Sequence, residues 1–306
     1  MKKINILFMM FLVAGINACD KDELYEREQY KKVFALLSDD GDNIFAEEID
    51  LKPDEATGWV VASVGGSLPT ESAIGITMVV DEDVLDRFNK RNFDVEYEKY
   101  ARLLSTDNYL IEKFDITIPA GERIGKMKIR LNAHGLSPDS TYFIPLRADH
   151  FTAYELKPSK SDVLYRVLLK NFYATQKTTT NYNLRGKLDN ANLMSIKQVF
   201  PVSGNKVRCM AGNISFEPNV ALINAASIVL EVDDDNKVYI TPWKTSDGIS
   251  VTQVEGDPDY PNIFKIEDTG YKTYKTFLLR YNYEYEGKTH EMWEELRLEF
   301  DKNKDN

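Results

Sequence analysis

Two short acidic runs have the residue types that could cleave glycosidic bonds, Asp233-Asp234-Asp235 and Glu255-Gly256-Asp257-Pro258-Asp259. Glycoside hydrolysis needs only two carboxylates at the right separation, so these runs are the first candidates for catalysis. Asp beside Gly or Pro is also what tight turns select, and neither run has the spacing of an EF-hand calcium loop. We interpret both runs as turns, and we assign no catalytic residue, metal or cofactor to the chain.

Histidine offers little further chemistry. The run His290-Glu291-Met292-Trp293-Glu294 begins like the zinc-protease motif H-E-x-x-H, but Glu294 stands where the second histidine ligand must be. The run is also strand-like, whereas the motif needs a helix that places both ligands on one face. His134 and His150 lie far away in the sequence and have no obvious partner. Phosphate-binding glycine loops and a nucleophile elbow are absent from the sequence as well.

Aromatic residues form a more promising set. In the last alternating stretch Leu296 marks one face, while Trp293, Glu295 and Arg297 mark the other. In such an arrangement a sugar ring could stack on the aromatic ring and form hydrogen bonds with the neighbouring carboxylate and guanidinium. A β-bulge within this stretch would instead turn Trp293 into the core.

Tyr239 and Trp243 form a second candidate pair, because they alternate against Val238 and Ile240. In a barrel, their side of the strand would be either the wall of a ligand cavity or packed interior. Trp59 stands beside two valines and is expected in the core. The glycan-binding candidates are therefore Trp243, Trp293, Tyr239 and Arg297.

Composition and charge exclude several partners. The 306 residues include 38 Lys and Arg against 49 Asp and Glu, a net charge of −11. Nucleic acid requires a basic surface, and anionic lipid would repel this chain. The length fits two domains of ordinary size. Only Cys19 and Cys209 are present, which excludes a disulfide framework and a cysteine-based zinc site, and Cys209 is predicted to be a buried, inert thiol.

The first residues indicate the compartment. Residues 1–18 combine two lysines with an apolar run too short to span a bilayer, as is typical of a secretion signal. Ile16-Asn17-Ala18-Cys19 resembles a lipobox, which favours lipidation at Cys19 over a plain secretory peptide. The tether 19–28 begins with acidic residues, either as a solvated spacer or as the surface-export signal that it resembles in Bacteroidota lipoproteins. We expect a lipid-anchored outer-membrane protein that faces the cell exterior.

Short alternating runs separated by Gly, Pro, Asp and Asn predict β-strands along most of the chain. Helical spacing within 82–105 predicts a short helical insertion of two helices. A polar run after Gln176 places the boundary between a domain of residues 29–177 and one of residues 178–306. The chain is thus predicted to be all-β, with an immunoglobulin-like β-sandwich followed by an antiparallel meander that closes as a calycin- or lipocalin-like β-barrel.

Several segments resemble a known family. They include Val64-Gly65-Gly66, the run from Gly135 to Tyr142 and Ser161-Asp162-Val163-Leu164-Tyr165 in the first domain, and Tyr182-Asn183-Leu184-Arg185-Gly186 and the run from Asp257 to Asn262 in the second. Together they resemble surface lipoproteins of polysaccharide-utilisation type from gut Bacteroidota. Their N-terminal domain, of unknown function, also stands ahead of chitinase-like endoglycosidases, and a non-catalytic β-domain usually follows it. The resemblance implies glycan capture beside a TonB-dependent transporter.

The first hypothesis is therefore a non-catalytic cell-surface lipoprotein that binds poly- or oligosaccharides for uptake. It predicts saturable glycan binding that falls when Trp243 or Trp293 is replaced by Ala. The alternative is a structural or adhesive, fimbria-like subunit that assembles by donor-strand exchange. A glycoside hydrolase with unrecognised carboxylates and small-ligand capture in a barrel are the remaining hypotheses.

Overall fold

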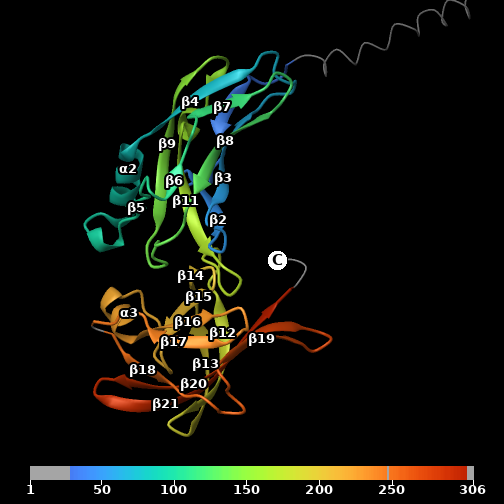
Figure 1. The fold of residues 1–306 in the computed structure, drawn as a ribbon. Coiled ribbons are helices and arrows are strands. Elements are labelled where there is room, and N and C mark those ends of the chain that lie inside the picture. The colour runs from blue at the N-terminus through green and yellow to red at the C-terminus, as the bar shows by residue number, and fades with distance from the viewer. Residues whose placement is uncertain (1–27, 247, 302–306) are drawn as a thin grey trace, which may run out of the picture.

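The computed structural model describes residues 28–246 and 248–301, and strands predominate in them (Figure 1). The predicted signal peptide, Cys19 and the tether up to residue 27 lie outside the described residues. The two α-helices of the described part are α2 (Glu82–Phe93) and α3 (Val220–Ala226). Within that part, no helix has the length and apolar character needed to cross a membrane. The predicted all-β class, with a sandwich and a barrel-like half, is confirmed.

Eleven strands build the N-terminal sandwich: β1 Val33–Leu36, β2 Ile44–Asp50, β3 Ala56–Val64, β4 Ile74–Val80, β5 Arg102–Leu103, β6 Tyr109–Leu110, β7 Asp115–Ile118, β8 Ile124–Leu131, β9 Tyr142–Phe151, β10 Glu155–Leu156 and β11 Asp162–Lys170. One sheet has the order β10-β1-β3-β8-β6 and the other β2-β11-β9-β4-β7, with β5 beside β9. Strand alternation directs one side of each sheet inward. Phe34, Ile76, Ile129 and Tyr165 thus meet in one core between the sheets.

The predicted helical insertion is only partly a pair of helices. Helix α2 begins after Asp81, whose carboxylate accepts a hydrogen bond from the backbone N–H of Asp83 at 3.2 Å. Its Val84, Leu85 and Phe88 cover the outer side of β9 and β11. The second predicted helix is wrong, because the chain forms only the 3-10 turn η1 (Tyr97–Lys99) before it pairs as β5. A further 3-10 turn, η2 (Pro158–Lys160), precedes β11.

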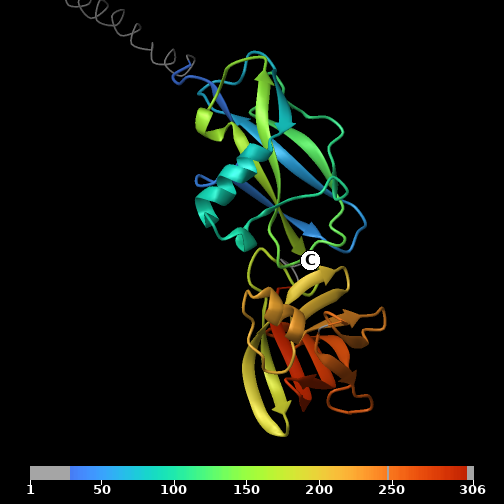
Figure 2. The same cartoon turned by 90° about the vertical axis from the view of Figure 1, so that its left-hand side faces the viewer.

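Ten strands build the C-terminal half: β12 Asn181–Leu188, β13 Ala191–Gln198, β14 Phe200–Ser203, β15 Lys206–Met210, β16 Ser227–Val232, β17 Val238–Pro242, β18 Ser250–Gln253, β19 Ile263–Asp268, β20 Thr273–Tyr285 and β21 Lys288–Phe300. A six-stranded sheet has the order β13-β12-β21-β20-β18, with β19 also beside β20, and β14 to β17 form a second sheet. The two sheets curl around a common core that includes Tyr182, Leu230, Phe277 and Tyr281 (Figure 2).

The described part of the chain ends in a long hairpin of β20 and β21. Its two-residue loop, Glu286-Gly287, has φ angles of 51° and 75°, the left-handed pair that a type I′ turn requires. The strands pair from Tyr285 and Lys288 to Thr273 and Phe300 without a shift in register. An uninterrupted register keeps alternate side chains of β21 on opposite faces.

An ion pair with a buried arginine joins the two halves. Arg208 on β15 is 1% exposed, and its Nη2 donates to Oδ1 of Asp139, in the loop before β9, at 2.6 Å. Its Nη1 donates to the other carboxylate oxygen. The Arg208 guanidinium also lies 4.8 Å from the ring of Phe200 and 5.2 Å from that of Trp243. Both oxygens of the carboxylate are thus occupied by one fixed guanidinium.

Two amide side chains add hydrogen bonds at this junction. Asn171 Nδ2 donates to the carbonyl oxygens of Ser203 at 2.6 Å and Lys206 at 2.9 Å. Gln176 Nε2 donates to the Pro138 carbonyl oxygen at 2.7 Å, and its Oε1 accepts from the Leu169 N–H at 2.7 Å. The segment between β11 and β12 is therefore bonded to both halves.

Replacing Asp139 by Ala is expected to lower the free energy of unfolding by about 3 kcal/mol, because it leaves the buried Arg208 charge uncompensated. Urea denaturation followed by circular dichroism measures this loss. The double variant Asp139→Ala with Arg208→Met should recover most of it, since a methionine needs no counterion. Equal stability of wild type and Asp139→Ala would contradict the role given to the pair.

Candidate functional site

The four predicted glycan contacts lie at separate places. Trp293 and Arg297 share the outer face of β21, in the six-stranded sheet. Tyr239 lies on β17 in the other sheet, and Trp243 follows the end of that strand. The structure therefore does not gather them into one site.

Trp293 lies on the polar face, as the alternation predicts, because Met292, Glu294 and Leu296 turn inward and the register has no bulge. The Arg280 guanidinium lies 3.7 Å from the centroid of the indole ring. The indole Nε1–H donates to Asp257 Oδ2 at 3.0 Å. One ring face and the only polar donor of this side chain are therefore already engaged within the protein.

Arg297 lines a pocket of about 290 Å³ on the same outer face, together with Asn183, Arg185, Met194 and Tyr274. Its guanidinium lies 3.8 Å from the centroid of the Tyr274 ring. This pocket is a secondary candidate, because the guanidinium covers one face of the Tyr274 ring and the volume is less than half that of the junction pocket described below.

Tyr239 is 43% exposed on the outer surface, where its hydroxyl donates to Asp233 Oδ2 at 3.2 Å. Val238 and Ile240 face the core instead, so both readings of the Tyr239 side, cavity wall or packed interior, are wrong. Trp243 packs against the buried Arg208 near the junction. Trp59 was expected in the core but is 38% exposed, since it falls on the outward side of β3, next to the Lys126 ammonium group.

The acidic runs are turns, as interpreted. Asp233 Oδ1 accepts hydrogen bonds from the backbone N–H groups of Asp235 at 3.0 Å and Lys237 at 2.8 Å. Asp257 Oδ1 accepts in the same way from Asp259 and Tyr260, both at 3.0 Å. These carboxylates thus accept hydrogen bonds from the backbone of their own loops, as turn residues do.

His290 lies on strand β21, as predicted, and its Nδ1 is 2.7 Å from Asp189 Oδ2. The backbone N–H of Glu291 and the His290 ring lower the pKa of Asp189. Within the described ranges no three His, Cys, Asp or Glu side chains come together as a metal site. Cys209 is buried, as predicted, and burial raises its pKa to about 12, so the thiolate is scarce at neutral pH.

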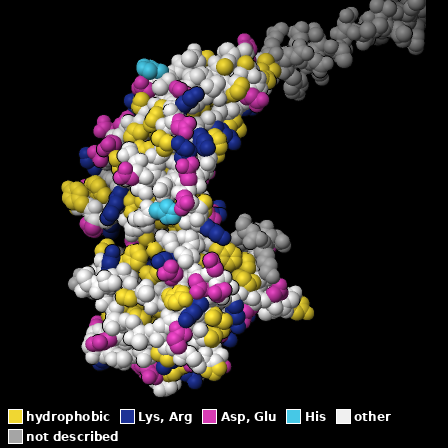
Figure 3. Space-filling view, viewed as in Figure 1, with side chains coloured by type: hydrophobic (Ala, Val, Ile, Leu, Met, Phe, Trp, Pro, Cys, Tyr) yellow, Lys and Arg dark blue, Asp and Glu magenta, His cyan; other side chains and the backbone are white. Residues whose placement is uncertain are grey.

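A larger pocket lies where the two halves meet. Its volume is about 610 Å³, and its lining includes Glu48, Lys52, Lys170, Phe172, Lys275 and Phe300. Pockets of this size at domain junctions commonly bind ligands. The space-filling view shows the molecule narrowing between its halves, with acidic and basic side chains intermixed over the surface (Figure 3).

Phe172 is the aromatic surface of this pocket and is 39% exposed. Its ring packs edge-on against Tyr173 at 5.5 Å, and against Phe264 and Phe300 at 6.1 Å between centroids. The Lys275 ammonium group lies 4.3 Å from the Phe172 centroid and donates to the Phe172 carbonyl oxygen at 2.5 Å. Packing against three rings fixes the orientation of Phe172 before any ligand arrives.

Polar groups surround this aromatic surface. Glu48 Oε1 accepts from the Thr175 hydroxyl at 2.5 Å, and Glu48 Oε2 lies 3.2 Å from Lys177 Nζ. Burial alone would raise the pKa of Glu48, but the bonds from Thr175 and Lys177 outweigh it and lower the pKa. The pocket thus offers ionised carboxylate and ammonium groups to a polar ligand.

Sequence reasoning missed this pocket. Its lining residues come from β2, from the segment between β11 and β12, and from β20 and β21. No local spacing links these segments. The one available signal was Phe172-Tyr173, an aromatic pair standing just before the polar linker.

Comparison with known families divides the chain in two. Residues 29–155 match a protein-family model that describes an N-terminal domain. Residues 161–297 match a second family model, which describes a C-terminal domain. Each model matches less than half of the chain, and the two together span most of it. The match to the C-terminal model starts just before β11, although β11 pairs within a sheet of the N-terminal sandwich.

Several solved Bacteroides structures are similar to this two-domain protein. A multidomain protein including DUF1735 from Bacteroides ovatus has a TM-score of 0.62 at 14% identity, covering 87% of this chain and 94% of its own. A protein of unknown function from the same species has a TM-score of 0.60 at 16% identity, with 93% and 96% covered. An auxiliary nutrient binding protein from Bacteroides thetaiotaomicron has a TM-score of 0.57 at 14% identity, with 86% and 93% covered. At these identities the similarity shows the fold; no curated protein matches the sequence.

Trp293→Ala is expected to lower the free energy of unfolding by about 2 kcal/mol, since it removes a half-buried ring stacked on Arg280. Tyr239→Ala removes an exposed ring and should change stability by no more than about 0.5 kcal/mol. Urea denaturation of the two variants compares them directly. Equal losses would show that the Arg280 and Asp257 contacts do not stabilise the fold.

Proposed function

We propose that this protein binds glycans at the pocket between its two halves, without catalysis. The observation that carries the proposal is the exposed, rigidly held ring of Phe172 inside a pocket of about 610 Å³. A sugar ring presents an apolar C–H face to an aromatic ring and hydroxyl groups at its edge. The pocket supplies partners for both, because ammonium, carboxylate and hydroxyl groups stand around the ring.

The energetics favour recognition of this kind. Holding the aromatic ring in place beforehand reduces the side-chain entropy lost on binding. Ionised groups such as Glu48 and Lys177 make stronger hydrogen bonds to sugar hydroxyls than neutral groups do. Binding then requires no group that changes its protonation state, which agrees with a capture role.

The wider setting of the proposal comes from the sequence and from the relatives. The resemblance of Ile16-Asn17-Ala18-Cys19 to a lipobox supports a lipid anchor in the outer membrane, and the acidic residues after Cys19 support domains that face the exterior. A solved relative with the same fold is named an auxiliary nutrient binding protein. In this proposal the captured glycan passes to a TonB-dependent transporter.

Phe172→Ala is expected to weaken glycan binding at least tenfold, about 1.4 kcal/mol, because the stacking surface is lost. A soluble chain that begins after Cys19 is first bound to a broad glycan array, and the hits are then measured by calorimetry. Tyr97→Ala, which removes an exposed ring beside helix α2, serves as the matched control.

Two results would contradict this proposal in different ways. A blank array with folded wild-type protein would remove glycan binding altogether. Unchanged affinity of Phe172→Ala would place binding elsewhere, and loss of affinity in Trp243→Ala or Trp293→Ala would then support the candidates taken from the sequence.

One observation favours the second candidate, a structural subunit that assembles through its strands. Strand β13 ends the six-stranded sheet, and its Met194 and Ile196 are 74% and 66% exposed. An exposed apolar edge strand can accept a strand from another chain. Analytical ultracentrifugation of wild type and Ile196→Lys tests this: self-association that the lysine abolishes would support assembly, and a strictly monomeric wild type would contradict it.

A further inference from the structure

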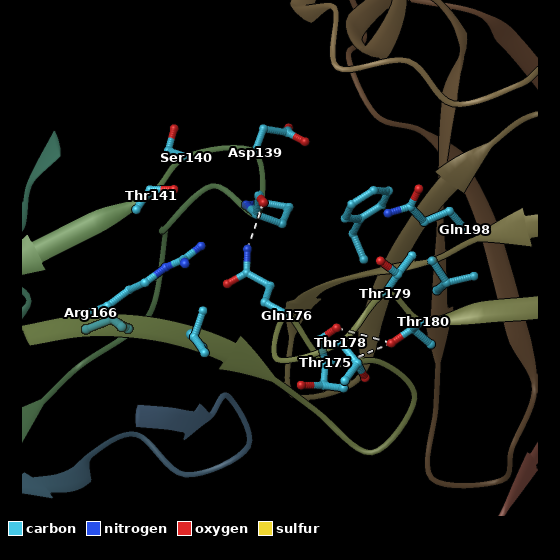
Figure 4. A pocket seen from close by; sticks show the side chains of 15 residues that line it. Asp139, Ser140, Thr141, Arg166, Thr175, Gln176, Thr178, Thr179, Thr180 and Gln198 are labelled. Atoms are coloured by element: carbon cyan, nitrogen blue, oxygen red, sulfur yellow. Dashed lines mark hydrogen bonds between the residues drawn. The ribbon is translucent and has the colours of Figure 1, made fainter. Parts of the chain in front are cut away.

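A second pocket at the junction has a volume of about 200 Å³ (Figure 4). Its lining residues include Asp139, Thr141, Arg166, Gln176 and Gln198. Figure 4 shows Arg166 extending from β11 into the space between the Asp139–Thr141 loop and Gln176. The pocket shares Thr175 and Thr178–Thr180 with the larger pocket.

Arg166 is a cation without a partner. Its Nε is shielded from solvent and has no hydrogen-bond partner, and within the described part of the chain its guanidinium makes no ion pair. Burial lowers the pKa of Arg166, and no carboxylate opposes that effect. Burying an unpaired guanidinium costs free energy, so a structural role alone does not account for it.

The one carboxylate in the pocket cannot neutralise Arg166. Asp139 directs both of its oxygens to Arg208, in the buried pair that joins the halves. The other lining residues are uncharged, and several carry hydroxyl or amide groups, including Ser140, Thr179 and Gln198. The pocket therefore holds one unbalanced positive charge among neutral hydrogen-bonding groups.

We propose that this pocket binds the anionic substituent of an acidic sugar, a carboxylate or a sulfate ester, through the Arg166 guanidinium. The inference rests on the proposed glycan binding and names its substrate class. A guanidinium matches the two oxygens of either substituent with a pair of parallel hydrogen bonds. The neutral hydroxyl and amide groups can then bind the rest of the sugar ring.

The size and the charge of the pocket both fit this ligand. At about 200 Å³ it is smaller than pockets that enclose a whole drug-sized ligand, and it suits a single sugar unit or its charged group. The chain as a whole carries a net charge of −11 and repels anions at long range. Acidic glycans would therefore be held by this local contact rather than by general attraction, which makes the contact selective.

The test compares glucuronic acid, glucose 6-sulfate and glucose by calorimetry with the soluble chain. Wild type is expected to bind one or both acidic sugars at least tenfold more tightly than glucose, and Arg166→Gln should abolish that preference. The two acidic ligands distinguish a carboxylate from a sulfate preference. Arg166→Lys keeps the charge but loses the paired donors, so it should retain only part of the preference.

Two controls separate binding from folding. Arg166→Gln should unfold at the same or a higher urea concentration than wild type, because it removes an unpaired, partly buried charge. Arg123→Gln removes a guanidinium that bonds to the Gly66 carbonyl oxygen and should leave the preference unchanged.

Three results would overturn the inference. They are equal binding of acidic and neutral sugars by wild type, an acid preference that survives Arg166→Gln, and an acid preference that is lost equally in Arg123→Gln. If neutral glycans from the array still bind in a Phe172-dependent way, the proposed function stands and only the substrate class is wrong. If no sugar or glycan binds, both proposals fail.

Discussion

The ion pair between Arg208 and Asp139 is the constraint on which the junction depends. Arg208 is buried in the C-terminal half, and its charge is tolerable only because both oxygens of a carboxylate from the N-terminal half meet it. Phe200 and Trp243 pack against the same guanidinium and keep water away from it. Separating the halves would expose these rings and break the pair together, so the ion pair ties the position of one half to the other.

The same pair shapes both pockets. By holding Asp139, Arg208 fixes the loop that contains Pro138, whose carbonyl oxygen accepts the Gln176 amide. That bond places the linker threonines that line both cavities. It also leaves Arg166 without a counterion in its pocket, because the one carboxylate that lines this pocket is already occupied. Because Arg208 takes the Asp139 carboxylate, Arg166 keeps a guanidinium that can bind an anionic ligand.

A second buried polar group explains the interior of the C-terminal half. Glu294 points inward from β21, where it pairs with the Lys197 ammonium and accepts the Tyr281 hydroxyl at 2.7 Å. The Tyr281 oxygen in turn accepts the Gly212 backbone N–H at 2.9 Å. These partners compensate for the buried carboxylate and allow β21 to keep strict alternation. Trp293 therefore stays on the outer face.

The sequence pattern predicted the elements whose structure depends on residues close together in the chain. The alternation of β20 and β21 and the helical spacing of α2 were both readable from the sequence. Strand β2 could not be predicted in this way, because the consecutive residues Glu47 and Glu48 interrupt its alternation. It is a strand because it pairs in parallel with β11. Helix α3 was not predicted either, because the helix that Asn219 caps is only seven residues long.

The site escaped prediction for a related reason. Alternation says which residues share a side of a strand, but not whether that side meets solvent, as Trp59 and Tyr239 demonstrate. Phe172 acquires its setting from segments more than a hundred residues apart in the chain, and Arg166 from segments on both sides of the junction, which only the packed halves bring together. Arg166 has no unusual neighbour in sequence; what distinguishes it is the commitment of Asp139 to Arg208. The functional character of this side chain is therefore a property of the joined domains, because neither half alone both buries the guanidinium and occupies the carboxylate that would neutralise it.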